Sequence, residues 1–190
     1  MSDSFDQLRR EMANAARVSF DAFREEIPAE TFYAFALYSD GDGRGATPAA
    51  NTEEALLRAI KKYSEKDYEP PERGHLRYIP DEWAYCGPKG DTDAWCKIWA
   101  MTQRLCENNA ASFRAFKRKA LDAMILALKD LDADGYFGVG PERELITLVI
   151  WLTDSPEALT WWGRSIKRLN PKSVLDRVVT EAPSWCKLKR

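Results

Sequence analysis

The stretch TFYAFALYSDGDG, residues 31–43, decides the fold of this chain of 190 residues. Aromatic and other strand-favouring side chains fill its first part, and a glycine-rich acidic turn follows them. That pattern predicts a strand that ends in a hairpin turn. The next segment, ATPAANT at residues 46–52, is expected to return as a shorter strand. The two segments together predict the beginning of a small antiparallel sheet.

Helical patterns flank this hairpin on both sides. Residues 3–26 carry apolar side chains at spacings of three and four, which predicts an amphipathic helix. Residues 53–66 predict a second helix, for which Thr52 is a suitable N-cap. The proline-rich segment that follows predicts a loop and then a third strand around residues 76–85. Pro80 would place that strand at a sheet edge or at a bulge.

After Gly90 the pattern becomes helical. Helices are predicted over residues 92–109, 111–130, 141–153, 155–169 and 171–180. Asp91 or Thr92 and Ser112 suit N-cap positions, and Pro141 suits the first turn of its helix.

Strands early in the chain and helices late in it predict an α+β fold. We expect a small antiparallel sheet of two to four strands in the N-terminal half, packed with six to seven helices. The length fits a single domain, 1–190. Within it, a helix and the small sheet would occupy about 1–90, and a helical part about 91–180.

Composition excludes several classes of protein. Hydrophobic residues make up 45% of the chain and charged residues 31%, so the chain can bury one sizeable core and shows no sign of general disorder. A net charge of −2 argues against a nucleic-acid binder, and the basic end, Lys187, Lys189 and Arg190, is expected to be a solvated tail. Without a long apolar run or an apolar N-terminus, we expect no membrane span, no signal peptide and a cytoplasmic protein.

The segment DLDADG, residues 130–135, resembles the opening of a calcium-binding loop. Asp130, Asp132 and Asp134 occupy alternate positions and Gly135 follows, but position 12 of such a loop would be Pro141 instead of a glutamate. We therefore predict no metal site, with these aspartates as weak candidates only. The preferred interpretation is a turn at a helix C-terminus in which the glycine adopts a positive φ angle.

The sequence shows no recognisable catalytic motif, and its 30 Asp and Glu residues are so many that any one carboxylate pair means little. His75 is the single histidine, and its pairing with Cys86 is a minor possibility. The four cysteines form no CxxC pair, which disfavours a zinc knuckle, and Cys96 and Cys106 are expected to be core or half-buried thiols. Asp81 and Glu82 are the least generic carboxylates. We expect no catalytic residue and no cofactor.

The chain contains seven tryptophans, which are Trp83, Trp95, Trp99, Trp151, Trp161, Trp162 and Trp185. Most are expected in the core. Trp161 and Trp162 are adjacent and cannot face the same way on a helix, so one of them is expected at a surface or at a junction between elements. An exposed tryptophan is typical of a binding hot spot.

Two pairs of stretches carry a family resemblance: FYAFALYSDGDG with ATPAANTEEAL, and RYIPDEWAY with ALKDLDADGYFG. Over roughly residues 1–170 the chain resembles an uncharacterised bacterial family, domain of unknown function 4303. The resemblance implies a small cytosolic protein of the kind found beside polymorphic toxins, where several unrelated folds act as immunity proteins. It implies no catalytic activity.

The expected function is therefore an immunity protein in interbacterial competition, which neutralises a cognate protein toxin by stoichiometric binding. The candidate contact residues are Asp40 and Asp42 in one turn and Asp81 and Glu82 in another. Trp83 would be the accompanying anchor if it is exposed, although a core position is favoured for it. The alternatives are an enzyme with carboxylate-based chemistry and a calcium-dependent regulator. Neither nucleic acid nor membrane is an expected partner, and the oligomeric state stays open.

Overall fold

A computed structural model describes residues 4–67, 69–183 and 186 of the chain. Trp185 and the basic end at Lys187, Lys189 and Arg190 lie outside the described residues. The predicted α+β class is confirmed, because a four-stranded sheet packs with seven α-helices in the described part. None of these helices is both long enough and apolar enough to cross a membrane.

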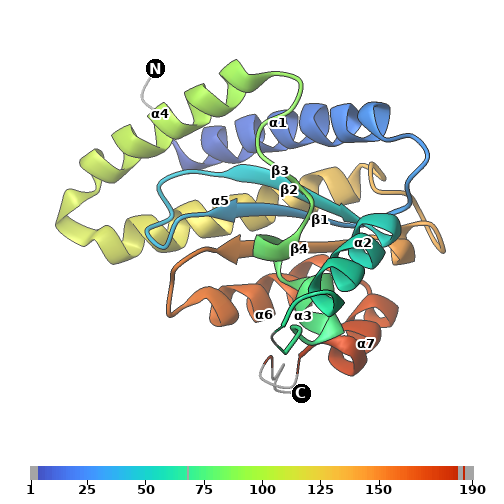
Figure 1. Cartoon of the computed structure of the whole chain (residues 1–190). Helices are drawn as coiled ribbons and strands as arrows, with labels where there is room; N and C mark the ends of the chain where they lie inside the picture. Colours follow the sequence, from blue (N-terminus) through green and yellow to red (C-terminus); the bar gives the residue numbers. More distant parts are fainter. Residues whose placement is uncertain (1–3, 68, 184–185, 187–190) are drawn as a thin grey trace.

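Six of the seven helices in the described residues were predicted from the sequence, and the one at Arg73–Tyr78 was not; Figure 1 shows their arrangement. They are α1 (Phe5–Glu26), α2 (Glu53–Ser64), α3 (Arg73–Tyr78), α4 (Thr92–Asn108), α5 (Phe113–Ala133), α6 (Ala158–Leu169) and α7 (Lys172–Glu181). Short 3₁₀ turns occupy Pro80–Glu82, Ala110–Ser112 and Arg143–Leu145. Two predicted N-caps are confirmed: the Thr52 hydroxyl accepts from the backbone N–H of Ala55, and the Asp91 carboxylate accepts from that of Ala94.

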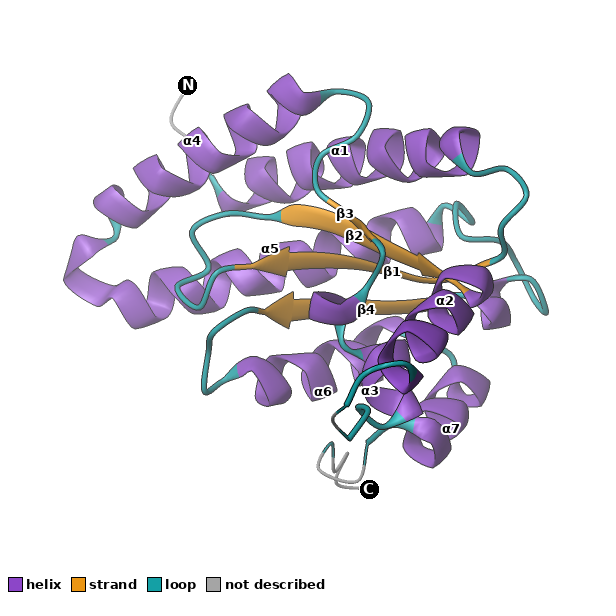
Figure 2. Ribbon diagram, in the orientation of Figure 1, coloured by secondary structure: helices purple, strands orange, loops and turns teal. Residues whose placement is uncertain are grey.

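The four strands are β1 (Phe32–Ser39), β2 (Thr47–Thr52), β3 (Tyr85–Cys86) and β4 (Thr147–Leu152). Their order in the sheet is β3-β2-β1-β4 (Figure 2). The predicted hairpin is confirmed, since β1 and β2 pair antiparallel with Phe35 opposite Ala50. The strand β4 instead runs parallel to β1, with Phe35 opposite Leu148, so the sheet is mixed and takes one strand from the C-terminal half.

Helices α1 and α5 lie behind the sheet in Figure 1, while α2 and α3 lie toward the viewer. The aromatic side chains of the opening stretch build the core between the sheet and α1. Phe20 of α1 has its ring centroid 4.7 Å from that of Phe35 on β1, and Phe137, just after α5, lies 5.9 Å from Phe35. Burial of these large rings is a principal source of stability in a domain of this size.

The prediction of a helix over residues 141–153 is wrong. A 3₁₀ turn at Arg143–Leu145 precedes β4, and all six residues of that strand are buried. A continuous apolar run of six residues fits a fully buried strand as well as a buried helix, so periodicity alone does not distinguish them. The free edge of β4 is covered by α6: the Ile150 N–H donates to the Ser165 hydroxyl, and the Leu148 N–H donates to the amide oxygen of Asn170.

The predicted strand over residues 76–85 is also mostly wrong. Its first part is helical in α3, and Pro80 begins a 3₁₀ turn, so only Tyr85–Cys86 pairs with β2 as a short edge strand. Hydrogen bonds from side chains hold this segment against the sheet, in place of a ladder of backbone hydrogen bonds. The carbonyl of Arg77 accepts hydrogen bonds from the Tyr33 hydroxyl and from the indole N–H of Trp83, both at 3.1 Å.

Candidate functional site: a tryptophan groove beside an acidic turn

The DLDADG segment forms the end of α5, and its three aspartates bind arginines. Asp130 accepts two hydrogen bonds from Arg9 at 2.5 and 2.7 Å, and Asp134 lies 3.3 Å from Arg17. Asp132 accepts from the guanidinium of Arg143. The carboxylates are thus spread over three different ion pairs and do not converge on a common point. This arrangement ties α1 and the turn before β4 to the end of α5.

Gly135 has a φ of +73°, which confirms the predicted turn conformation. A Cβ atom there would strain the backbone, so Gly135→Ala is expected to lower the free energy of unfolding by about 1 kcal/mol or more. Chemical denaturation followed by circular dichroism measures this change. Gly45→Ala is the matched control because Gly45 has no positive φ, and it should cost clearly less. Equal costs at the two glycines would refute the strained turn.

The acidic turn at Asp40–Asp42 follows β1 directly, and both carboxylates are exposed. One oxygen of Asp40 accepts from the backbone N–H groups of Asp42 and Arg44, at 3.1 and 3.0 Å, which fixes the turn. Asp42 lies 3.6 Å from the Arg44 guanidinium on the surface. Of the two, Asp42 has the side chain that is less engaged in holding the backbone.

The second candidate pair, Asp81 and Glu82, lies in the 3₁₀ turn after α3. Asp81 accepts a 2.7 Å hydrogen bond from the indole N–H of Trp151 on β4. Glu82 accepts one at 2.9 Å from the Tyr63 hydroxyl and lies 3.5 Å from His75. Both carboxylates therefore help to hold the turn in place, which makes them poorer choices than Asp42 for a binding test.

Three tryptophans weighed as binding residues are buried. Trp83 is 6% exposed, so it occupies the favoured core position and offers no exposed anchor. Trp161 and Trp162 are 6% and 1% exposed, so neither lies at an open surface, and of the two predicted positions only a junction between elements fits them. Helix α6 packs between the sheet edge and α5, which gives both indoles a covered position.

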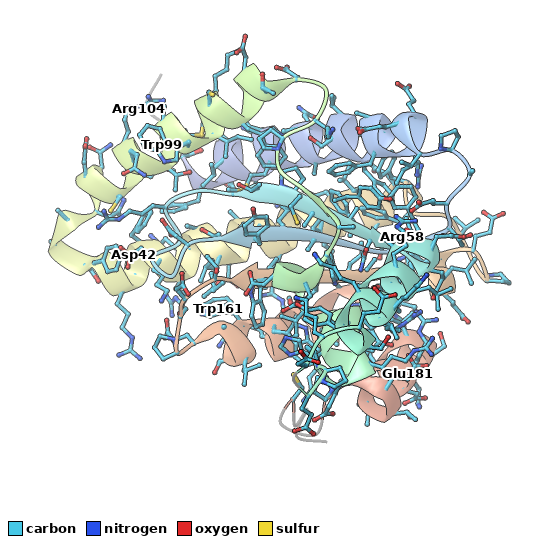
Figure 3. The ribbon with its side chains drawn as sticks, in the orientation of Figure 1. Asp42, Arg58, Trp99, Arg104, Trp161 and Glu181 are labelled. Atoms are coloured by element: carbon cyan, nitrogen blue, oxygen red, sulfur yellow. The ribbon has the colours of Figure 1, made fainter. Side chains whose placement is uncertain are left out.

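Among the six tryptophans that the structure describes, Trp99 on α4 is the one that projects from the surface, at 59% exposure. It lines a groove of about 680 Å³, called here the Trp99 groove. The lining residues are Tyr38, Ser39, Asp40, Gly45, Ala46, Thr47, Pro88, Thr92, Trp95, Cys96, Trp99 and Ala100. Figure 3 shows Trp99 and Asp42 on the same side of the molecule. The groove thus joins aromatic surface to the acidic turn.

Two further features of the groove escaped prediction. Ser39, at the end of β1, has a buried hydroxyl with no hydrogen-bond partner among the described residues, so a ligand group at the groove could satisfy it. Cys96 is exposed, so the prediction of a core or half-buried thiol is wrong for it, whereas Cys106 is half-buried as predicted. The exposure of Trp99 could have been predicted from the helical spacing of α4. Trp95, Ile98 and Leu105 form the buried side of that helix, and Trp99 falls at the margin of this side.

Electrostatics connect the groove to the second acidic turn. Burial raises the pKa of Tyr38, and the neighbouring Cys86 and Asp81 raise it further. Asp81 accepts from Trp151, which lies opposite Tyr38 in the pairing of β4 with β1, so Asp81 is near a residue that lines the groove, whereas Trp83 does not line it. Partial burial of its sulfur and the charge of Asp81 raise the pKa of the Cys86 thiol, which disfavours its thiolate form at neutral pH.

The fold and this groove define an α+β protein with an aromatic groove, lined by Asp40 of the acidic turn, at the C-terminal end of β1. Residues 12–171 match the family described as Domain of unknown function (DUF4303), and the chain belongs to that family. No curated protein and no solved structure matches the chain.

Proposed function

We propose that this protein is a cytoplasmic immunity protein that neutralises a cognate bacterial toxin by binding it stoichiometrically through the Trp99 groove. The observation that carries the proposal is the exposed Trp99 in a groove that Asp40 also lines, with the exposed Asp42 two residues further along the same turn. An exposed indole is costly to leave in water and becomes a strong anchor once a partner covers it.

The groove also indicates the chemistry of the toxin surface. Its walls are largely apolar and aromatic, and its rim carries the acidic turn. A complementary toxin would insert an apolar side chain against Trp99 and place lysine or arginine next to Asp42. Opposite charges at the rim accelerate association, while the covered aromatic contact slows dissociation.

The test first asks whether a toxin gene lies beside the gene for this protein, and the absence of one would count against the proposal. Where one is found, the purified toxin is the binding partner in the assay. Trp99→Ala is expected to weaken its binding by about 2 kcal/mol or more, which is about thirtyfold in Kd, because a central anchor is lost. Asp42→Lys is expected to reduce mainly the association rate, and that reduction should fade at high salt. Surface plasmon resonance separates the two rates, and growth of toxin-producing cells reports protection.

Leu57→Ala is the matched control, because Leu57 on α2 is an exposed apolar residue with 57% of its side chain accessible. That variant should bind and protect like the parent. Full protection by Trp99→Ala would place the contact elsewhere. Toxin modification at a ratio far below one protein per toxin would favour the alternative, an enzyme with carboxylate-based chemistry.

A further inference from the structure

Helices α5 and α6 carry a basic surface that the sequence did not predict. Two adjoining hollows of about 580 and 560 Å³ open there, and Arg118 from α5 and Arg164 from α6 line both. The first hollow also borders α1, where Phe5 and Asp6 line it, and the apolar side chains of Ala123 and Leu126 lie along it. The two hollows thus form one extended surface, called here the arginine face.

The charge of this face is opposite to that of the chain. The residues that line the two hollows include seven Lys or Arg and three Asp or Glu, a local excess of four positive charges. The chain as a whole has a net charge of −2. Such a separation of charge directs an anionic partner to one side of the molecule.

Three of the seven cations already have carboxylate partners. Arg9 binds Asp130, Lys117 binds Glu157, and Arg168 binds Asp122 at 2.6 Å. The remaining four have no carboxylate partner in the described part of the chain, and they are Arg114, Arg118, Lys119 and Arg164. All four are exposed on α5 and α6. Lys119 and Arg164 lie over the rings of Phe5 and Trp161, but no carboxylate of the described residues neutralises them, so a ligand carboxylate could pair with them.

We propose that the arginine face is a docking surface for an acidic segment of a protein partner. Three of the four unpaired cations are arginines, whose planar forks bind carboxylates in a bidentate manner. Apolar side chains accompany them in the lining: Phe5 and Leu126 border the first hollow, and Trp161 borders the second. Arginine combined with apolar and aromatic side chains is the composition of protein interfaces.

A nucleic acid suits this surface less well. Arg164 lies over the ring of Trp161 at 4.4 Å, and that indole is only 6% exposed, so it offers no platform on which a base could stack. Asp6, Asp122 and Glu157 also lie among the cations and would repel a continuous phosphate backbone. A peptide with spaced carboxylates can avoid these positions.

The arginine face is separate from the Trp99 groove, and the proposal does not rest on toxin binding. The loop after β1 lies between the two surfaces. A Cβ atom at Gly43 would contact Lys117 and Leu121 of α5 at 3.5 Å, whereas one at Gly45 would contact Trp99 of α4 at 3.4 Å. A partner on one surface would therefore leave the other surface accessible, and two partners bound together would meet at this loop.

The experiment measures fluorescence anisotropy of a labelled peptide of alternating glutamate and leucine, titrated with the full-length protein. A labelled oligo-dT strand is titrated in parallel. We expect the peptide to bind more tightly than the strand. The double variant Arg118→Glu with Arg164→Glu should weaken peptide binding at least about tenfold, because both hollows lose their shared cations.

Lys61→Glu with Lys62→Glu on α2 is the matched control, since it changes the net charge equally on another exposed helix. It should alter peptide affinity by less than about twofold, because distant exposed charges are largely screened. Circular dichroism verifies that both variants fold, and Arg118→Gln with Arg164→Gln should give an intermediate loss. Absence of peptide binding, an equal loss in both charge-reversed variants, or tighter binding of the oligonucleotide would overturn the proposal.

Discussion

Asp132→Ala is expected to lower the free energy of unfolding by about 2–3 kcal/mol. The reason is Arg143, whose side chain is 9% exposed. This guanidinium donates to Asp132, to the carbonyl of Ile146 at 2.5 Å and to the carbonyl of Leu169 at 2.7 Å. Removal of the carboxylate would leave a buried positive charge with only neutral acceptors. Urea denaturation followed by circular dichroism measures the loss.

Asp134→Ala is the control within the same segment. Its carboxylate is 66% exposed and meets Arg17 at 3.3 Å, so its removal should change stability by no more than about 0.5 kcal/mol. Asp132→Asn should fall between the two, because an amide oxygen can still accept from Arg143 without neutralising it. A loss at Asp132 no greater than that at Asp134 would show that Arg143 does not depend on its carboxylate.

The sequence predicted the segments whose local pattern agrees with their tertiary environment. The amphipathic spacing over residues 3–26 gives α1, because the apolar side of that helix covers the sheet in the way its period implies. The aromatic stretch before the acidic turn gives β1 for the same reason. Thr52 and Asp91 cap their helices through bonds that span three residues, so local sequence contains the whole interaction.

Interactions that join distant parts of the chain could not be predicted in this way. The strand β4 depends on β1, more than one hundred residues earlier, and on the polar side chains of α6 that cover its edge. Taken alone, its apolar run is equally compatible with a helix. Asp132 is similar, because nothing near it in sequence indicates that Arg143 would be buried against it.

In the candidate site, too, the local features were predicted from the sequence and the tertiary features were not. The acidic turn at Asp40–Asp42 was predicted, because its glycines and its position after a strand are local features. Its aromatic partner was not, since Trp99 reaches the turn only through the packing of α4 against the loop after β1. The arginine face is also tertiary: it combines α5 and α6, whose charges are far apart in sequence and average out in a chain of net charge −2.

Trp162→Ala is expected to be the most destabilising single substitution proposed for this protein, at about 3–5 kcal/mol. The indole is 1% exposed, and its N–H donates a 3.1 Å hydrogen bond to the carbonyl of Tyr78 at the end of α3. Truncation would leave a large cavity beside β4 and remove the donor that links α6 to α3. Trp162→Phe should retain much of the packing and cost less. Thermal unfolding followed by circular dichroism ranks the variants.

Trp99→Ala deletes the same side-chain atoms at a position that is 59% exposed, so it should cost less than about 1 kcal/mol of stability. The pair therefore separates the two roles of tryptophan in this chain. Trp162 is expected to matter for folding, and Trp99 for binding a partner at nearly unchanged stability. If Trp162→Ala unfolded no more easily than Trp99→Ala, the result would contradict the described packing of α6 on the sheet. If Trp99→Ala unfolded as easily as Trp162→Ala, its loss of toxin binding would no longer indicate a contact.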